Sequence, residues 1–265
     1  MLIAQLSDCH ITEPGEKACG VAPTAENLGR CVDHINRLEP EPDLVLVTGD
    51  ITACGLLAEA EHAAQLLRKL RYPYYVIPGN HDDRNTLWSV FGGNACPSRL
   101  GDFFNYAVDG HEIRLLAMDS TLPGAPGGEV CEARADWLDR RLAEAPMQPT
   151  IIFTHHPPLK FGVLETDEDG FVGADRFGDV VERYSNIERI VCGHVHLLVH
   201  ARWRGSVVST APSMGMQLSL DLTMKRRSEF LLQAPAYLLH YWNEDKNLIT
   251  HSVTVADAEG PFPFD

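Results

Sequence analysis

The chain has 265 residues, of which 45% are hydrophobic and 22% charged, an ordinary balance for a globular protein with a real core. Lys and Arg number 22 and Asp and Glu number 37, so the formal net charge is 22 − 37 = −15. An acidic surface repels nucleic-acid backbones and anionic membranes, which argues against both as bulk partners. An anionic substrate would need a local source of positive charge, and a metal site would supply one.

The cysteines and the N-terminus bear on the cellular compartment. The seven cysteines are odd in number, irregularly spaced and without a C-x-x-C pair, which predicts free thiols in a reducing compartment. The chain enters the apolar run LIAQL at once, with no basic segment before it, and no apolar run reaches the length of a membrane span. We therefore expect a cytoplasmic protein.

The first part of the chain alternates short apolar strands with helical patterns. Strands are predicted at 2–8, 43–50 and 74–80, and amphipathic helices at 25–38 and 57–70. Asp83 is a predicted N-cap for a short helix that ends at Phe91.

The second part is richer in strands. A hairpin is predicted over 105–120 with its turn at Asp109-Gly110, followed by a helix at 132–143. Strands at 150–156 and 187–194 enclose a helix near 175–184, and the runs AYLLHYW and NLITHSVTV form a last strand pair. Segment 159–175 reads as a polar loop, and 212–236 has a mixed pattern. The order of elements predicts two packed sheets flanked by helices.

Most of the early and central strands are followed by residues of metal-binding type. These residues are Asp8 and His10, Asp50, Asn80 and His81, His155 and His156, and His194 and His196. Carboxyl ends of strands gather at one edge of an open sheet, where ligands bind. A single strand-end Asp or His is usually a cap or a surface residue, but packing does not explain the ordered set.

The mixture of donors indicates a particular chemistry. Two divalent ions about 3.5–4 Å apart can clamp a phosphoryl group and hold a hydroxide in line for attack. Carboxylates lower the cost of placing two cations together, and imidazoles favour Zn, Mn, Fe or Co over Ca or Mg. One carboxylate must be shared between the ions, and Asp50 is placed centrally for this.

Five motifs carry a family resemblance: D-x-H (8–10), G-D (49–50), G-N-H-D (79–82), H-H (155–156) and G-H-x-H (193–196). In order and spacing the chain resembles the calcineurin-like metallophosphoesterases over about the first 200 residues. It looks closest to the bacterial branch of glycerophosphodiesterases and class III cyclic-nucleotide phosphodiesterases. The expected fold is an α/β four-layer α-β-β-α sandwich of two mixed sheets. We expect a catalytic domain at 1–205, and at 206–265 further strands and a small dimerisation or cap segment packed on it.

The resemblance implies roles for individual residues. Two divalent ions (Mn, Fe, Zn or Co) are implied, bridged by Asp50 and a water or hydroxide that serves as nucleophile. Asp8, His10 and His196 would hold one ion, and Asn80, His155 and His194 the other. His81 would contact a phosphoryl or leaving-group oxygen and donate a proton to the departing alkoxide.

The residues after Asp50 distinguish this chain from other branches. Protein Ser/Thr phosphatases have Asp and Arg where this chain has Ala53 and Cys54, which argues against a phosphoprotein phosphatase. Purple acid phosphatases have an iron-binding Tyr at the place of Ala53, so no tyrosinate colour is expected.

Other polar residues have simpler interpretations. Asp82 and Asp83 are predicted to cap the following helix rather than to act in catalysis. His156 either supports a ligand or orients Pro157 and Pro158, and the sequence leaves this open. The acidic stretch TDEDG (166–170), within segment 159–175, is interpreted as a solvated active-site flap. Ordinary packed or solvated positions are expected for His34, His62, His111, His200, His240 and His251.

The expected function is hydrolysis of small phosphodiesters, with glycerophosphodiesters and 3′,5′-cyclic nucleotides both open and phosphonate or aryl esters possible. Alternatives are a non-catalytic metal-binding scaffold, or a phosphomonoesterase or nuclease of the same superfamily. The apolar residues around MKRR (224–227) resemble an interface, so a homodimer or higher homo-oligomer is expected, with no nucleic-acid or membrane partner.

Overall fold

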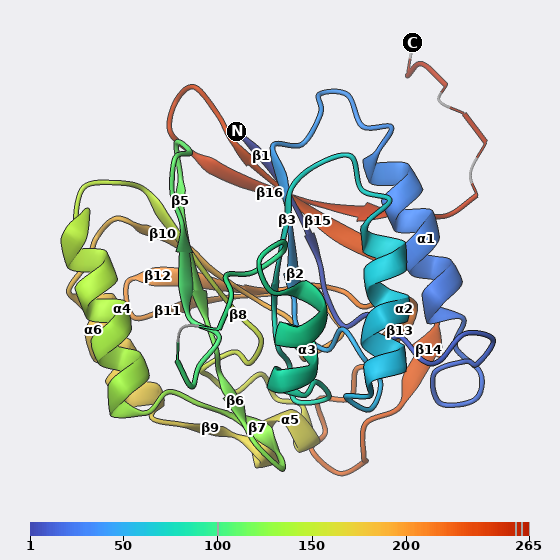
Figure 1. Cartoon of the computed structure of the whole chain (residues 1–265), viewed down its shortest axis with the longest axis horizontal. Coiled ribbons are helices and arrows are strands. Elements are labelled where there is room, and N and C mark those ends of the chain that lie inside the picture. Colours follow the sequence, from blue (N-terminus) through green and yellow to red (C-terminus); the bar gives the residue numbers. More distant parts are fainter. Residues whose placement is uncertain (100, 258, 261, 265) are drawn as a thin grey trace.

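A computed structural model describes residues 1–99, 101–257, 259–260 and 262–264, so positions 258, 261 and 265 of the predicted C-terminal segment lie outside it. Two β-sheets lie against each other, and helices cover the outer side of each (Figure 1). The four-layer α/β sandwich predicted from the sequence is confirmed.

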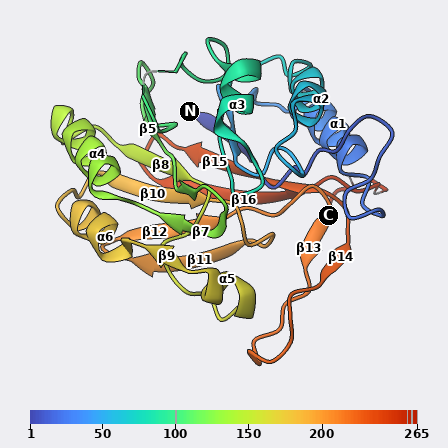
Figure 2. The same ribbon diagram turned by 60° about the horizontal axis from the view of Figure 1, so that its bottom comes forward.

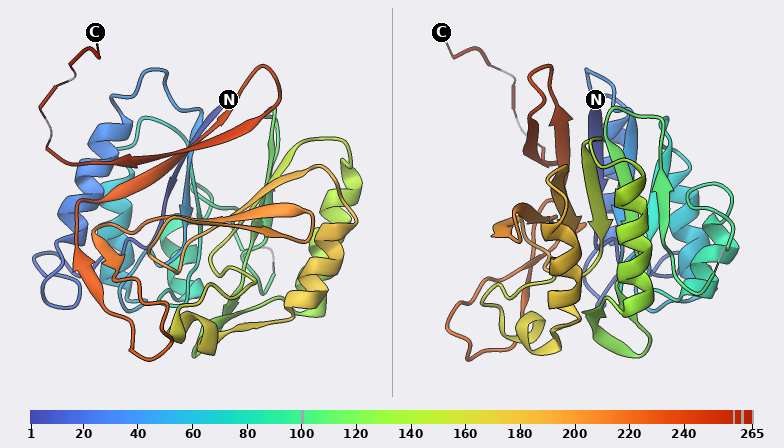
Figure 3. Two further views of the ribbon diagram at one scale, coloured as in Figure 1. Left: turned by 180° about the vertical axis from the view of Figure 1, so that it is seen from behind. Right: turned by 90° about the vertical axis from the view of Figure 1, so that its left-hand side faces the viewer.

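The first sheet joins the two ends of the chain. Its strand order is β16-β15-β1-β2-β3, with β16 Leu248–Thr254, β15 Ala236–Trp242, β1 Leu2–Leu6, β2 Leu44–Thr48 and β3 Tyr74–Ile77. β1, β2 and β3 pair in parallel, whereas β15 pairs antiparallel with both β1 and β16. The predicted last strand pair therefore completes the sheet that the N-terminus begins (Figure 3).

The second sheet is also mixed. Its strand order is β11-β12-β10-β8-β5-β4, with β11 Val199–Trp203, β12 Ser206–Thr210, β10 Ile187–Cys192, β8 Thr150–Thr154, β5 Arg114–Met118 and β4 Tyr106–Val108. The central strands are parallel and both edges are antiparallel. β4 and β5 form the predicted hairpin, while the β11–β12 hairpin was not predicted.

Helices cover the outer faces of the sheets as their apolar spacing predicts. The bounds are α1 Thr24–Ile35, α2 Leu57–Leu67, α3 Arg84–Phe91, α4 Glu132–Glu144 and α6 Ala174–Glu182. α1, α2 and α3 lie on the side of the first sheet, and α4 and α6 on the side of the second (Figure 1). None of the described helices combines the length and apolar character that crossing a bilayer requires.

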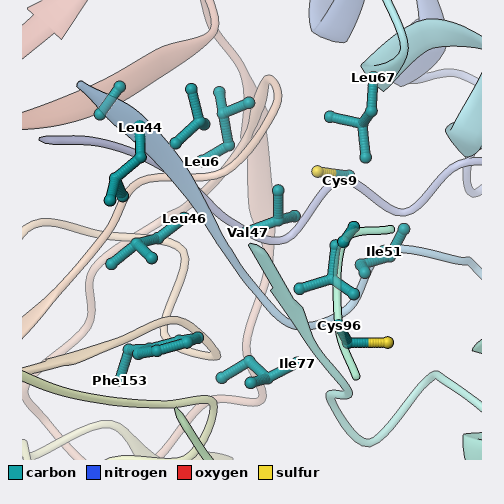
Figure 4. Packing of buried hydrophobic residues seen from close by; sticks show 14 of the residues in the cluster. Leu6, Cys9, Leu44, Leu46, Val47, Ile51, Leu67, Ile77, Cys96 and Phe153 are labelled. Carbon is teal, nitrogen blue, oxygen red and sulfur yellow. The ribbon is translucent and has the colours of Figure 1, made fainter. Parts of the chain in front are cut away.

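The core follows the two-residue period of the strands. In β8, Phe153 belongs to the cluster that contains Leu46 and Ile77 of the first sheet, and Figure 4 shows these three side chains together. Its neighbour Ile152 packs on the other side of the sheet, in the cluster with Leu138 of α4. Alternate residues of β8 thus pack the second sheet against the first sheet on one side and against the helices of the second sheet on the other.

Segment 159–175 is more regular than predicted. It contains the short helix α5 (Leu164–Asp169) and β9 (Phe171–Val172). β9 pairs with β7 (Ala125–Glu129), which pairs with β6 (Thr121–Leu122). The loop prediction was wrong here because α5 buries no residue, so no apolar period marks it in the sequence.

Segment 212–236 contains a projecting two-stranded element. β13 (Met216–Leu218) and β14 (Phe230–Leu232) pair antiparallel, and the connection between them extends from the body of the molecule (Figure 2). We call residues 216–232 the arm. Leu220, Leu222 and Leu232 on the arm are 55%, 64% and 56% exposed.

Candidate metal centre

The polar residues that follow β1, β2, β3, β8 and β10 meet at one edge of the two sheets, as the parallel strand directions require. Their donor atoms form two clusters, each with its atoms within 4.8 Å of one another. The clusters are Asp8, His10, Asp50 and His196, and His155, His156 and His194. The structure therefore brings together all the residues that the sequence singled out as ligands, with Asn80 beside the second cluster.

The first cluster has spacings that suit one cation. The Nε2 atoms of His10 and His196 are 3.0 Å apart. His10 Nε2 is 3.6 Å from Asp50 Oδ2, and His196 Nε2 is 3.5 Å from Asp8 Oδ1. Ligand atoms at about 2.0–2.1 Å from a tetrahedral zinc ion are roughly 3.4 Å from one another. The donor set fits a divalent metal in both type and spacing.

The second cluster gathers around the side-chain oxygen of Asn80. Asn80 Oδ1 is 3.2 Å from His155 Nε2 and 3.1 Å from His194 Nδ1. Asp50 Oδ2 is 3.4 Å from His155 Nε2, so this one oxygen faces both clusters. The other oxygen of Asp50 accepts the backbone N–H of His81 at 2.9 Å. Asp50 is thus fixed in an orientation that two cations could share.

Backbone carbonyls set the tautomers of two of the histidines. His155 Nδ1 is 2.8 Å from the Thr48 carbonyl oxygen, and His196 Nδ1 is 2.7 Å from that of Met216. A carbonyl can only accept, so each Nδ1 carries the proton and donates it. When the ring carries only this one proton, Nε2 directs a lone pair into the cluster, an arrangement typical of metal-binding histidines.

The backbone bends sharply at the candidate ligands. Positive φ angles occur at Asp8 (50°), His10 (42°), Asp50 (48°), His194 (71°) and His196 (55°). Non-glycine residues rarely adopt this left-handed region, and each costs on the order of 1 kcal/mol or more. Cys9, between two of them, is turned into the core near Leu67 of α2 (Figure 4). The strained backbone lowers the stability of the fold here, but it orients the donor side chains toward the two clusters.

Two motif glycines are explained by lack of space. A Cβ on Gly79 would lie 2.2 Å from Asp50 Oδ1, and one on Gly193 would lie 2.1 Å from Ser7 Oγ and 2.8 Å from Asp8 Oδ2. Any side chain at either position would displace a candidate ligand. The glycines of G-N-H-D and G-H-x-H therefore allow the strand ends to approach one another.

The histidines of the site differ in their protonation state because their surroundings differ. Burial, with smaller effects from neighbouring imidazoles, lowers the pKa of both His10 and His194 to about 3. Burial also opposes charge on His155, but the Asp50 carboxylate outweighs it and raises the pKa of His155 to about 9. Burial opposes charge on Asp50 too, yet His155 and its neighbours hold the Asp50 pKa well below its usual value. At neutral pH His10 and His194 thus present lone pairs, and His155 forms an ion pair with Asp50.

His156 differs from the other histidines of the site. Its Nε2 is 3.0 Å from the Pro126 carbonyl oxygen and 3.2 Å from Asn80 Oδ1, and its Nδ1 is 2.9 Å from Ser120 Oγ. The carbonyl can only accept, so Nε2 carries the proton and can also donate to Asn80. Of the two roles left open by the sequence, support of a candidate ligand is the one that the contacts favour.

His81 belongs to neither cluster of the described residues and has an exposed side chain. Its Nδ1 donates to the Ala53 carbonyl oxygen at 2.8 Å, and its ring centroid is 4.7 Å from that of His10. The ring is therefore held beside the first cluster, and its Nε2 has no hydrogen-bond partner in the part of the chain that the structure describes. None of the histidines predicted to be packed or solvated joins either cluster.

Asp82 and Asp83 have separate roles. Asp83 accepts the backbone N–H of Thr86 at 2.8 Å, which confirms it as the cap of α3. The prediction was wrong for Asp82, which accepts the backbone N–H groups of Ile51, Thr52 and Gly79 at 2.8–3.0 Å. Burial and the nearby Asp50 raise the pKa of Asp82 to about 6. Asp82 joins the loops after β2 and β3 rather than starting a helix.

Two cavities open beside His81 and Asn80, and both residues line each of them. The first cavity, of about 380 Å³, is also lined by Asp83, Arg84 and Asn85. The second, of about 340 Å³, is reached by Glu165 of α5. Nothing in the sequence marks the lining of the first cavity, whereas segment 159–175 was expected near the site and contributes Glu165 to the second.

Comparison with known proteins agrees with these observations. The profile of the family described as calcineurin-like phosphoesterase matches residues 1–198. A protein of Arcobacter nitrofigilis named probable glycerophosphodiester phosphodiesterase GpdQ is 35% identical over 265 residues, covering 100% of this chain and 97% of the relative. The 3′,5′-cyclic adenosine monophosphate phosphodiesterase CpdA of Escherichia coli is 28% identical, over 81% of this chain and 76% of the relative.

Among solved structures, a dimetal phosphatase from Danio rerio superposes with a TM-score of 0.59 at 15% identity, covering 97% of this chain and 99% of that one. This likeness concerns the fold alone.

Proposed function

The chain belongs to the calcineurin-like phosphoesterase family, and from this premise we propose that it is a metal-dependent hydrolase of small phosphodiesters. The observation that carries the proposal is the pair of donor clusters that share Asp50 Oδ2. The scaffold alternative is disfavoured, because every candidate ligand and His81 are present and converge.

The proposed ligands follow the two clusters. Asp8, His10 and His196 would hold one divalent ion, Asn80, His155 and His194 the other, and Asp50 would be shared; Mn, Fe, Zn and Co suit these donors. Such ions, when bound, would stabilise charge on the phosphoryl group and lower the pKa of water.

His81 would act on the substrate instead of on a metal. Its Nδ1 proton is held by the Ala53 carbonyl, so the ring keeps its orientation beside the first cluster. When the ring carries a second proton, Nε2–H can donate to the oxygen of the leaving alkoxide.

Glycerophosphodiesters are the favoured substrates. Two relatives named for that activity match the whole chain at 35% and 33% identity, whereas relatives named for cyclic-nucleotide hydrolysis are 28–29% identical, over 73–97% of the chain. Cyclic nucleotides are the second candidate, and we include phosphonate and aryl esters as further substrates because the centre would recognise chiefly the phosphoryl group.

The test is hydrolysis of bis(p-nitrophenyl) phosphate with defined metals. Asp50→Asn should lower kcat at least 100-fold, since it removes the shared carboxylate, and near-parental activity would contradict the sharing. His81→Ala should slow turnover about 100-fold, as expected for a lost general acid, while metal content by elemental analysis stays at the parental value. Loss of metal from His81→Ala would make His81 a ligand. A preference for a phosphomonoester in the same assay would overturn the diester assignment.

We also propose a cytoplasmic homo-oligomer in which the 1–205 catalytic domain is extended by the 206–265 segment. The exposed Leu220, Leu222 and Leu232 of the arm support contact between copies of the chain. Sedimentation of Leu222→Ser/Leu232→Ser beside the parent tests this, and a monomeric parent would contradict it.

A further inference from the structure

The two cavities are arranged for a substrate with two arms. Both are lined by Asn80 and His81, and they extend from the candidate metal centre past different elements. In a phosphodiester two alcohols branch from one phosphorus. A phosphoryl group at the centre could therefore place one alcohol in each cavity. The residues that line a cavity would then determine which alcohol binds there.

The first cavity contains a distinctive side chain. Among the described residues, Arg84 is the one lysine or arginine that lines either cavity. Its guanidinium is held by Asp119, with Nε 2.6 Å from Oδ2 and Nη2 3.1 Å from Oδ1, and Nη2 also donates to the Thr121 carbonyl at 2.8 Å. Asp119 is completely buried. Arg84 is thus fixed before any substrate arrives, which reduces the entropic cost of using it.

The pairing determines which ligand Arg84 suits. Nη1 has no hydrogen-bond partner in the described part of the chain, so it can donate to a ligand. The charge of Arg84 is offset by Asp119, and Asp82 and Asp83 also line the cavity. A second anionic group would be repelled here, whereas a neutral hydroxyl would be accepted.

The neighbours of Arg84 complete a set of donors and acceptors. Asn85 Oδ1 accepts from Arg99 at 3.0 Å, which leaves the amide N–H₂ of Asn85 for a ligand. Asp83 uses Oδ1 to cap α3 and keeps Oδ2 as an acceptor. Hydroxyl groups both donate and accept, so adjacent hydroxyls on one alcohol match this set.

We propose that the first cavity binds a hydroxylated alcohol arm of the substrate, with Arg84 and Asn85 as the residues that specify it. The inference rests on the proposed function, because the phosphoryl group of the same molecule would lie at the candidate metal centre. It adds to that function the side of the site that recognises hydroxyls and the residues that do so.

The experiment compares two phosphomonoesters as inhibitors of bis(p-nitrophenyl) phosphate hydrolysis. Glycerol 3-phosphate and n-propyl phosphate have the same chain length and differ by two hydroxyl groups. The metal-loaded parent should bind glycerol 3-phosphate roughly tenfold more tightly, the size expected for hydrogen bonds that involve a charged donor. Arg84→Gln and Asn85→Ala should each reduce this ratio to about threefold or less, with n-propyl phosphate inhibition unchanged.

Matched controls separate the outcomes. Arg71→Gln removes one positive charge at an exposed site that does not line the cavity and should keep the parental ratio. Asn85→Ala is informative even if Arg84→Gln, which deprives buried Asp119 of a partner, does not fold. Equal inhibition by the two phosphates in an active parent overturns this inference alone, as does a ratio that survives both cavity substitutions. Absence of hydrolysis by the metal-loaded parent overturns the proposed function, and this inference with it.

Discussion

Asn80 and His81 are neighbours in sequence with different surroundings. The Asn80 oxygen lies within 3.2 Å of nitrogens from His155, His156 and His194, whereas His81 is exposed and bonded to the Ala53 carbonyl. Their position after a predicted strand indicates that both residues lie near the site. Their separation into a candidate ligand and a substrate-facing group depends on the turn after β3, because consecutive side chains there point in different directions.

The protonation of His155 predicts how metal affinity depends on pH. The free protein holds a proton on His155 up to a pKa of about 9, and a metal can use Nε2 only after that proton leaves. Affinity for one ion should therefore rise as the pH rises from 6 to 9, by up to about tenfold per unit, and level off above 9. His10 and His194, with pKa values of about 3, contribute nothing in this range.

Calorimetric titration with Mn²⁺ or Zn²⁺ in buffers of different ionisation enthalpy measures this proton. About one proton should be released from the protein at pH 7, in addition to any from bound water. His155→Ala is the control that should lose the buffer dependence together with one site. A buffer-independent heat in the parent at pH 7 would contradict the assignment.

At the scale of elements, the ends of β2 and β3 approach so closely that Gly79→Ala should break the site. The added Cβ would lie 2.2 Å from Asp50 Oδ1 and 2.3 Å from the Asp50 backbone nitrogen. We expect at least a tenfold loss of metal affinity and a destabilisation of about 1–3 kcal/mol, the usual cost of overpacking.

Thermal denaturation and elemental analysis check this expectation. Gly29→Ala is the matched control, because Gly29 lies within α1 and its Cβ would meet no atom within 4 Å. It should stabilise the protein slightly, since alanine is the better helix former. A Gly79→Ala protein with parental metal content would show that the loops relax without moving Asp50.

Elements with a regular apolar pattern could be predicted from the sequence, and those without one could not. α1 was predicted because Leu28, Cys31, Val32 and Ile35 bury one face. α5 buries nothing, and β7 (APGGE) is a strand only through its pairing with distant segments. Short elements of this kind depend on contacts that no local pattern encodes.

The candidate site divides in the same way. Strand-end Asp, Asn and His residues are visible in the sequence because their side chains carry the chemistry. The Met216 carbonyl that orients His196 has no such signature, since every residue has a carbonyl. Asp82 was misassigned because its partners, Ile51 and Thr52, come from another loop.

At the scale of the whole molecule, a buried polar network joins the two sheets. Gln5 of β1 donates to the Cys192 carbonyl of β10 at 3.0 Å, and His240 of β15 contacts the Gln5 oxygen at 2.9 Å. His240 Nδ1 is 2.8 Å from Thr250 Oγ1. The oxygen of Gln5 can only accept, so neutral His240 donates through Nε2.

This network predicts sensitivity to acid. Burial, followed by repulsion from Arg189 and His200, lowers the pKa of His240 to about 3, compared with about 6.5 in the unfolded chain. The unfolded state therefore binds the proton first, and stability present above pH 6.5 is lost as the pH falls towards 3. The slope from this one group is about 1.4 kcal/mol per pH unit.

Urea denaturation of metal-free protein between pH 7 and 5 measures the slope. The free energy of unfolding of His240→Gln should depend less steeply on pH than that of the parent, by nearly the slope of about 1.4 kcal/mol per pH unit that His240 contributes. The exposed His251→Gln, on the neighbouring strand β16, should keep the parental slope. Equal slopes for the parent and His240→Gln would mean that His240 does not resist protonation.

The hydrogen bond from His196 to Met216 connects a candidate ligand to the base of the arm. If copies associate through the arm, metal binding and assembly become thermodynamically linked, and the linkage is reciprocal. If assembly raises the affinity for metal by some factor, metal binding must raise the affinity between copies of the chain by the same factor. Dilution would then draw metal out of the protein by dissociating the oligomer, so metal content measured at high protein concentration would overstate the occupancy in a dilute activity assay.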